Sequence, residues 1–268
     1  TAQEISDIYN DTEPLVGGSS SSTTPGTIDT TNMLVWYKFD DAANIGLDSS
    51  GNSNDGTGAN VSIDNTNKIR GTSSVSFNNG NITRDFNIYN YISNGFTVSF
   101  WYKIAIANSQ PYPAFLTFTN PADFSKKIYM GAYFPTSNTS ACYVYFDDGN
   151  ELKQILFGEN TMNDQWHHLI WVYNPDGEWN IYIDNVKDSR TQTVQITDVN
   201  FTKMSIGYMD ESRNNGRFNG NIDDFRIYNK ALTAQEISDI YNDTEPLVGG
   251  SSSSTTPGTI DTTNMLVW

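Results

Sequence analysis

The amino-acid sequence predicts an all-β protein, folded as a two-sheet antiparallel sandwich with one short helix near its C-terminal end. Three observations carry this prediction. Short apolar or alternating runs recur along the chain, and clusters of Gly, Pro, Asn and Asp separate them, as is typical of strands joined by turns. Aromatic residues make up 13% of the 268 residues, enough to fill a core although only 37% of the residues are hydrophobic. One segment stands out as a helix.

The predicted strands are runs that are apolar or alternate between apolar and polar residues. They cover residues 34–39, 96–102, 128–134, 142–146, 153–157, 166–173, 179–184, 204–208 and 222–228. The run 96–102 largely alternates, which predicts a half-buried strand. Residues 174–177 read Asn-Pro-Asp-Gly, and this turn chemistry predicts a hairpin between the runs on either side.

The predicted helix begins at a capping box. Thr233 is followed three residues later by Glu236, so each side chain can satisfy a backbone N–H of the first turn. Leu232 and Ile237 occupy the two positions of a hydrophobic staple around this start. The helix is expected to close the domain and to end at about Asn242.

One segment of the sequence occurs twice. Residues 1–36 and 233–268 are identical, at an offset of 232 residues. Such an identity does not arise by chance, so we expect a slice of a longer tandem array; a cloning choice that included both flanks is the alternative. The expected divisions are the terminal helix of the preceding repeat (1–11), a linker (12–32), the β domain (33–243), a second copy of the linker (244–264) and the start of the next first strand (265–268).

The linker is rich in Gly, Ser, Thr and Pro, a composition typical of extended connecting segments. We expect it to lie against a domain, as an added strand.

Composition excludes several classes of function. A formal net charge of −16 opposes binding to the phosphate backbone of nucleic acids. No apolar run reaches the roughly 18 residues of a membrane-spanning helix, so no membrane insertion is expected. The single cysteine, Cys142, excludes an intrachain disulfide framework and is expected to be a small buried residue.

Three motifs resemble a known family. They are Leu34–Asp40 with Asp48–Asn52, then Trp166–Leu169, then Gly220–Thr233 with the helix that follows. Their order and spacing are similar to those of a laminin G-like domain, a jelly roll of the concanavalin A-type lectins and glucanases. The resemblance covers about residues 33–242. It implies two antiparallel sheets of six or seven strands, one of them concave, with the chain start and chain end side by side.

The resemblance also implies a structural calcium ion between the loop at residues 48–56 and the closing strand. Calcium prefers six to eight oxygen ligands, and the loop is dense in them. The positions that match are Asp40, Asp48, Asn54 and Asp223, with backbone carbonyls. The alternative is a polar turn in which Asp48 accepts local N–H bonds.

No catalytic function is expected. Glucanases of this fold carry a Glu-x-Asp-x-(x)-Glu strand that holds two carboxylates on one face, and this sequence has no such string. The nearest acidic cluster, residues 147–151, reads as a hairpin tip. His167 and His168 are adjacent on a predicted strand and should point to opposite faces, so they cannot chelate one ion together.

Sugar binding is the remaining site hypothesis. Many domains of the family that the chain resembles stack sugars on exposed aromatics, and candidates here are Tyr112, Tyr133, Tyr143, Trp179 and Tyr208. The polar loop 209–216 is a candidate rim. The alternative is that these aromatics fill the sandwich core or form cross-strand pairs.

Two functional hypotheses follow. The first is a non-enzymatic repeat unit of a long extracellular or cell-surface filament or stalk, whose partners are neighbouring identical repeats joined head-to-tail and stiffened by calcium. The alternative is a lectin-like adhesion module that binds glycans and is repeated for avidity. An ordered linker would favour the first hypothesis, and an exposed aromatic cleft on the concave face would favour the second.

Overall fold

The structure is a computed structural model that describes residues 30–105, 112–133, 141–149, 152–158, 161–197, 200–208 and 216–243. Residues 12–29 of the predicted linker, its second copy, the first copy of the helix and the start of the next repeat lie outside the described residues. So does most of the candidate rim loop.

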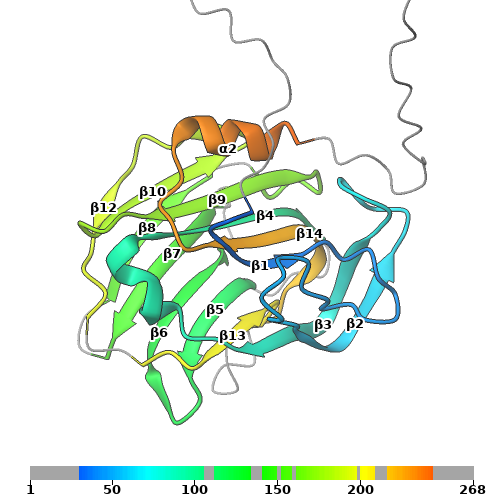
Figure 1. The fold of residues 1–268 in the computed structure, drawn as a ribbon, viewed down its shortest axis with the longest axis horizontal. Coiled ribbons are helices and arrows are strands. Elements are labelled where there is room, and N and C mark those ends of the chain that lie inside the picture. Colours follow the sequence, from blue (N-terminus) through cyan, green and yellow to red (C-terminus); the bar gives the residue numbers. More distant parts are fainter. Residues whose placement is uncertain are drawn as a thin grey trace, which may run out of the picture.

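The described chain is built from antiparallel strands, with one 3-10 helix and one α-helix (Figure 1). The strands are β1 (Met33–Tyr37), β2 (Thr57–Asp64), β3 (Ser74–Asp85), β4 (Phe96–Ile104), β5 (Ala114–Asn120), β6 (Asp123–Tyr133), β7 (Ala141–Asp148), β8 (Leu152–Phe157), β9 (His167–Tyr173), β10 (Glu178–Ile183), β11 (Val186–Lys187), β12 (Gln192–Thr193), β13 (Lys203–Ile206) and β14 (Asn219–Tyr228). The 3-10 helix is η1 (Ile88–Asn94) and the α-helix is α2 (Ala234–Tyr241). The predicted fold class is confirmed.

The strands form one continuous path that curls into two facing layers. Its order is β11-β10-β9-β4-β14-β3-β13-β5-β6-β7-β8, with β1 beside β14, β2 beside β3 and β12 beside β10. Aromatic contacts join the two halves of the path across the core. Phe115 of β5 lies 5.7 Å from Phe100 and 4.7 Å from Tyr102 of β4, measured between ring centroids. The core therefore lies between the β10-β9-β4-β14 layer and the β13-β5-β6-β7-β8 layer.

Helix α2 covers the outside of the first layer (Figure 1). Its capping box is present as predicted, with both Thr233 and Glu236 contributing, and Asn242 caps its C-terminal end. Ile237 and Ile240 pack on outward residues of β9 and β14. The prediction of a half-buried strand at 96–102 is wrong, since β4 is buried on both faces along almost its whole length. The face of β4 that points away from the core is covered by α2 and by the segment that leads to this helix.

The predicted hairpin is confirmed, since β9 and β10 pair around the turn at residues 174–177. Strands β2, β3 and β5 were not identified from sequence. The pairing of β2 with β3 shifts register between Ala59 and Val61, and Asn60 and Asn79 adopt positive φ values of 54° and 57°. These irregularities interrupt the alternation on which strand prediction depends.

The first strand and the segment that follows α2 lie at the same place in the domain. A buried arginine on β14 and its carboxylate partners connect them. Trp36 of β1 donates from Nε1 to Asp224 Oδ1 at 2.7 Å. Arg226 of β14 is fully buried and bonds both Asp224 (2.8 Å) and Asp243 (2.9 Å), the last described residue of the C-terminal segment. We call Asp224, Arg226 and Asp243 the Arg226 bridge. It fixes the start of β1 and the end of the domain side by side.

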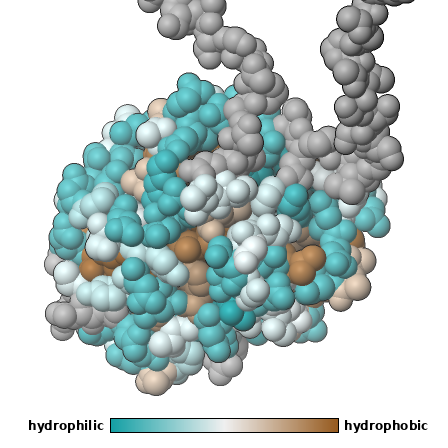
Figure 2. Space-filling view, viewed as in Figure 1, coloured by the Kyte–Doolittle hydropathy of each residue, from teal (hydrophilic) through white to brown (hydrophobic). Residues whose placement is uncertain are grey.

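The molecular face seen in Figure 2 is mostly hydrophilic, with small hydrophobic areas separated from one another. Over the part of the chain that the structure describes, no helix has the length and apolar character needed to cross a membrane.

Candidate functional site

A pocket opens on the outside of the second layer, on the face that points away from the core. Its volume is about 370 Å³. We call it the tyrosine pocket, and it is lined by Tyr112, Tyr133, Tyr143, Tyr145, Leu152, Gln154 and Leu156.

Strand alternation explains why these residues face outward. On β7, Cys142, Val144 and Phe146 belong to the core, so the intervening Tyr143 and Tyr145 project from the other face. On β8 the same alternation buries Ile155 and Phe157 and exposes the pocket residues between and before them. Because β8 is the last strand of the path, the pocket lies at the edge of the sheet.

The pocket walls are paired aromatic rings. Tyr143 and Tyr145 lie with planes 6° apart and centroids 5.9 Å apart. Tyr112 and Tyr133 stack at 5.2 Å with planes 21° apart. Leu152 is 53% exposed and Tyr112 is 42% exposed, so apolar surface is open to solvent here. An exposed apolar cluster rimmed by polar groups is typical of a binding surface.

Tyr129 of β6 supports the pocket from below. It is fully buried, and its ring lies 5.1 Å from that of Tyr143 and 4.9 Å from that of Tyr145. Its hydroxyl donates a 2.6 Å hydrogen bond to the backbone carbonyl of Tyr112. The ring lies over Gly131, where a Cβ would come within 2.6 Å of it, so only glycine leaves room for this arrangement.

The chemistry of the lining is uniform. Its polar groups are four phenol hydroxyls and the carboxamide of Gln154, and none of the lining side chains is charged at neutral pH. Flat apolar rings next to neutral hydrogen-bonding groups suit a ligand that has both an apolar face and hydroxyl groups.

Three of the five aromatics proposed from sequence line this pocket, namely Tyr112, Tyr133 and Tyr143. The other two do not. Trp179 is fully buried in the core against Trp171, as the alternative interpretation expected. Tyr208 does not line the pocket, and its ring lies under the guanidinium of Arg217, 4.2 Å from the ring centroid. Sequence reasoning missed Tyr145, Leu152, Gln154 and Leu156, although the alternation of β7 places Tyr145 beside Tyr143.

Of the four calcium positions proposed from sequence, the structure brings Asp40 and Asp223 together around the loop at residues 69–73. Asp223 Oδ2 accepts the backbone N–H groups of Ile69 and Arg70, and Asp40 Oδ1 accepts those at positions 72 and 73. Gly71 lies against the second oxygen of Asp40: a Cβ there would be 2.2 Å from Oδ2.

Asp48 and Asn54 form a separate polar turn. Asp48 Oδ1 accepts from the backbone of Trp36 and Ser50, and Oδ2 accepts from the Ser50 hydroxyl and the Asn54 backbone. Asn54 donates to the carbonyl of Leu34 and accepts from Arg84. Both Asp48 oxygens therefore have local donors, which is the geometry of the polar-turn alternative.

Asp223 is the residue whose surroundings best suit a bound cation. This residue is fully buried, and its Oδ1 has no hydrogen-bond partner. Burial raises the pKa of this carboxyl to about 8, against the opposing effect of the two N–H donors. A buried oxygen without a partner, next to a second carboxylate, is suited to a bound cation. No cluster of three or more His, Cys, Asp or Glu side chains occurs among the described residues, so backbone carbonyls would have to complete the shell.

Of the acidic cluster at residues 147–151, Asp147 lies near the end of β7, while residues 150 and 151 lie outside the described residues. Asp147 pairs in register with Leu152, and its Oδ1 accepts the backbone N–H of Gly149. A carboxylate that caps its own turn is not held as one of two opposed catalytic groups.

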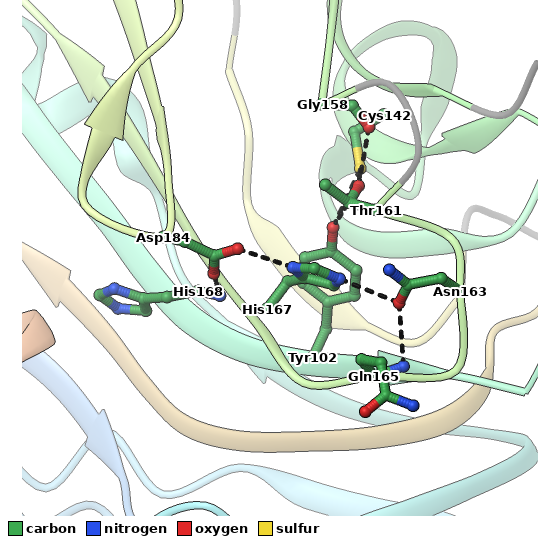
Figure 3. A network of polar contacts seen from close by, with 9 residues as sticks. All are labelled: Tyr102, Cys142, Gly158, Thr161, Asn163, Gln165, His167, His168 and Asp184. Carbon is green, nitrogen blue, oxygen red and sulfur yellow. Dashed lines mark hydrogen bonds and ion pairs between the residues drawn. The ribbon is translucent and has the colours of Figure 1, made fainter.

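The two histidines point to opposite faces of β9, which confirms the prediction (Figure 3). His167 bonds Asp184 through Nδ1 at 2.7 Å and Asn163 through Nε2 at 3.0 Å. His168 is buried between Trp101 and Tyr241, with its Nε2 2.9 Å from Ser99 Oγ. Burial, with nearby positive charge, holds the pKa of His168 well below 6.5.

Cys142 is buried and unpaired, as predicted. Its Sγ lies 3.6 Å from the hydroxyl of Tyr102 and 3.8 Å from that of Thr161, in the polar network of Figure 3. Burial raises the pKa of the thiol to about 12, so it is not a reactive thiolate.

A protein-family model described as the concanavalin A-like lectin/glucanases superfamily matches residues 70–238. The chain belongs to this superfamily, in agreement with the resemblance of its motifs to a laminin G-like jelly roll. A comparison with curated proteins finds no match.

Solved structures with this fold include domain 4 of AbnA, an extracellular GH43 arabinanase from Geobacillus stearothermophilus, in complex with arabinotriose. The likeness has a TM-score of 0.59 and 19% identity, and it covers 78% of this chain and 98% of that domain. The binding domain of botulinum neurotoxin serotype D gives a TM-score of 0.59 and 18% identity over 79% of this chain and 52% of the other. This chain thus spans about half the length of the neurotoxin domain. At such identities the likeness establishes the fold alone.

Proposed function

We propose that this domain is a non-catalytic carbohydrate-binding module that recurs along a tandem array. The tyrosine pocket carries the proposal. It is an aromatic cleft on the outer face of a sheet, open to solvent at Tyr112 and Leu152, which a binding module needs and a plain spacer does not.

The physical support is the match between the pocket and a sugar ring. One face of a sugar ring consists of C–H groups that pack on an aromatic face, whereas its hydroxyls need hydrogen-bond partners. The paired rings of Tyr143 and Tyr145 and the carboxamide of Gln154 offer both. The arabinanase domain of the same fold is described in complex with arabinotriose, which also favours a saccharide ligand.

Repetition would compensate for weak single sites. The identical segments 1–36 and 233–268 favour an array of equal modules. Linked sites turn later binding events into intramolecular ones, and avidity then exceeds the affinity of each site by orders of magnitude.

The test is binding of the 268-residue chain to a panel of soluble polysaccharides and oligosaccharides, by affinity electrophoresis and calorimetry. Tyr143→Ala should weaken binding about tenfold, which corresponds to roughly 1.4 kcal/mol of lost ring contact. Tyr112→Ala removes a half-exposed ring without opening a core cavity and should weaken binding as well. Tyr89→Ala, which removes an equally exposed tyrosine on η1, is the matched control. Absence of binding to any saccharide would contradict the proposal.

A second candidate is a repeat unit of an extracellular filament or stalk, and the identical terminal segments favour it as well. The Arg226 bridge adds a geometric consequence. Because the chain enters and leaves at one place, the axial length per repeat would be set mainly by the linker between domains. A stretched linker of this length spans about 70 Å. Electron microscopy of the native array tests this: straight filaments with a constant repeat favour a fibre, and beads at variable spacing favour tethered modules.

Calcium is the proposed structural cofactor, held by Asp40 and Asp223 and by backbone carbonyls. An ion there would neutralise a buried carboxylate and join the loop at residues 69–73 to β14. It would supply rigidity and no reaction step. The contacts of Asp48 and Asn54 favour a structural turn for that loop, so the proposal rests on Asp40 and Asp223.

A further inference from the structure

We infer that the tyrosine pocket selects neutral saccharides and rejects acidic ones such as sialylated or uronic-acid glycans. This inference rests on the proposed carbohydrate-binding function and narrows it to a ligand class. Three observations carry it: the chemistry of the lining, the charges on the same sheet face, and the charge of the whole chain.

Among the described residues, the lining holds no cation. A carboxylate-bearing sugar that enters a pocket loses hydration, and that loss is recovered only through a charged or well-directed donor. None of the lining side chains is an Arg, Lys or His. A neutral sugar brings hydroxyls, which the phenols and the Gln154 carboxamide can satisfy without a charge.

The charged residue that follows the pocket along β7 is negative and would repel an acidic ligand. Asp147 is the next outward residue after Tyr145. Lys127 of β6 stands opposite Asp147 in register, but it is 6% exposed and does not line the pocket. An acidic sugar at the Tyr145 end of the pocket would therefore approach a carboxylate and not an available cation.

The long-range field acts in the same direction. A chain with a formal net charge of −16 repels anions at distances within the Debye length, about 8 Å at physiological salt. Neutral ligands do not experience this repulsion.

The pocket is equally unsuited to a purely apolar ligand. Such a molecule would displace water from the exposed carboxamide of Gln154 without replacing its hydrogen bonds, and this loss weakens binding. The combination of apolar rings and neutral hydrogen-bonding groups therefore points to neutral, hydroxyl-rich molecules.

The experiment compares neutral and acidic oligosaccharides of equal length on the 268-residue chain by calorimetry. The probes are arabino-, gluco- and manno-oligosaccharides against sialylated and galacturonic-acid oligosaccharides. The key variant is Gln154→Lys, which places one cation in the pocket at an exposed position of an edge strand. Its matched control is Gln235→Lys on α2, at the opposite outer face of the sandwich. Both variants change the net charge equally, so only the first tests the pocket.

The expected result is measurable binding of at least one neutral oligosaccharide and none of the acidic ones. Gln154→Lys should raise affinity for the acidic probes about fivefold, the factor that an exposed charge pair of roughly 1 kcal/mol provides, and added salt should reduce this gain. Gln235→Lys should leave the preference unchanged.

Two outcomes overturn the inference and are distinguishable. Acidic probes that bind the unaltered chain as tightly as neutral ones, with loss in Tyr143→Ala, would refute the selectivity while leaving carbohydrate binding intact. No binding of either class would refute the proposed function as well. Self-association of the chain that Tyr143→Ala abolishes would assign the pocket to a second copy and would also refute the inference.

Discussion

The hydroxyl of Tyr129 donates a 2.6 Å hydrogen bond to the backbone carbonyl of Tyr112 and so anchors the segment that carries one wall of the tyrosine pocket. Tyr129 itself is fully buried and does not line the pocket. It is therefore a positioning residue: it acts on a ligand only through Tyr112 and through the rings of Tyr143 and Tyr145.

Tyr129→Phe should separate positioning from folding. The ring remains and the hydrogen bond to the Tyr112 carbonyl is lost, so the free energy of unfolding should fall by about 1 kcal/mol. Saccharide affinity should fall several-fold because Tyr112 is no longer fixed before the ligand arrives. Calorimetric binding together with urea unfolding measures both effects. Tyr102→Phe also removes a buried tyrosine hydroxyl and should leave binding unchanged; equal affinity loss in both variants would contradict the assignment.

Arg226→Met should be among the most damaging single changes in the domain. It leaves Asp224 and the C-terminal Asp243 without their buried partner, and removal of one member of a buried ion pair costs about 3–5 kcal/mol. Arg190→Met removes an ion pair with Asp188 whose arginine side chain is 41% exposed, and it should cost less than about 1 kcal/mol. Urea denaturation of both variants provides the comparison, and similar losses in the two would refute a special role for the Arg226 bridge.

Asp223→Asn tests the calcium proposal. Saturating calcium, at about 100 times its dissociation constant, should stabilise the unaltered chain by about 2.7 kcal/mol and raise Tm by about 5–10 °C. The variant should not respond to calcium. In the presence of a chelator its stability should stay close to that of the unaltered chain, because the amide oxygen can still accept the N–H groups of Ile69 and Arg70. If the unaltered chain has the same Tm with calcium and with chelator, the calcium proposal is wrong.

His168 should make stability depend on pH below 6.5. Its pKa is depressed in the folded state by burial and by Arg226 and Arg70, so the native protein keeps it neutral. The unfolded chain binds a proton there as pH falls through about 6.5 and the folded chain does not, so the free energy of unfolding decreases by up to about 1.4 kcal/mol per pH unit. His168→Gln should reduce the dependence of the unfolding free energy on pH between pH 6.5 and 5. The reduction should correspond to close to one proton fewer taken up on unfolding. Ser99→Ala, which removes the bond to His168 but keeps the imidazole, should retain the slope.

The local elements of this fold could be read from the sequence because their information is local. The capping box of Thr233 and Glu236 lies within one helical turn, and the Asn-Pro-Asp-Gly turn fixes the β9–β10 hairpin. The alternation of β7 shows that Tyr143 and Tyr145 share a face. Such patterns depend on residues a few positions apart, where backbone geometry alone relates them.

The features that the sequence did not predict depend on residues far apart in the chain. Strand β2 carries little apolar signal and pairs with β3 through positive-φ asparagines, so its place in the sheet depends on its partner. Strand β4 alternates as a half-buried strand does, yet α2 and the segment before it cover its polar face from more than 120 residues away in sequence. Among the sugar candidates, nothing local distinguishes Trp179 in the core from Tyr143 in the wall of the tyrosine pocket.

The sequence by itself determined the all-β class, the closing helix and the identity of residues 1–36 with residues 233–268, because each depends only on spacing or identity along the chain. Only the tertiary structure decided which aromatics form the tyrosine pocket, and that Asp40 meets Asp223 while Asp48 closes its own turn. The physical reason is that both sites are built by residues brought together through long-range strand pairing. Whether an outward side chain remains at the surface depends on which distant element packs over it.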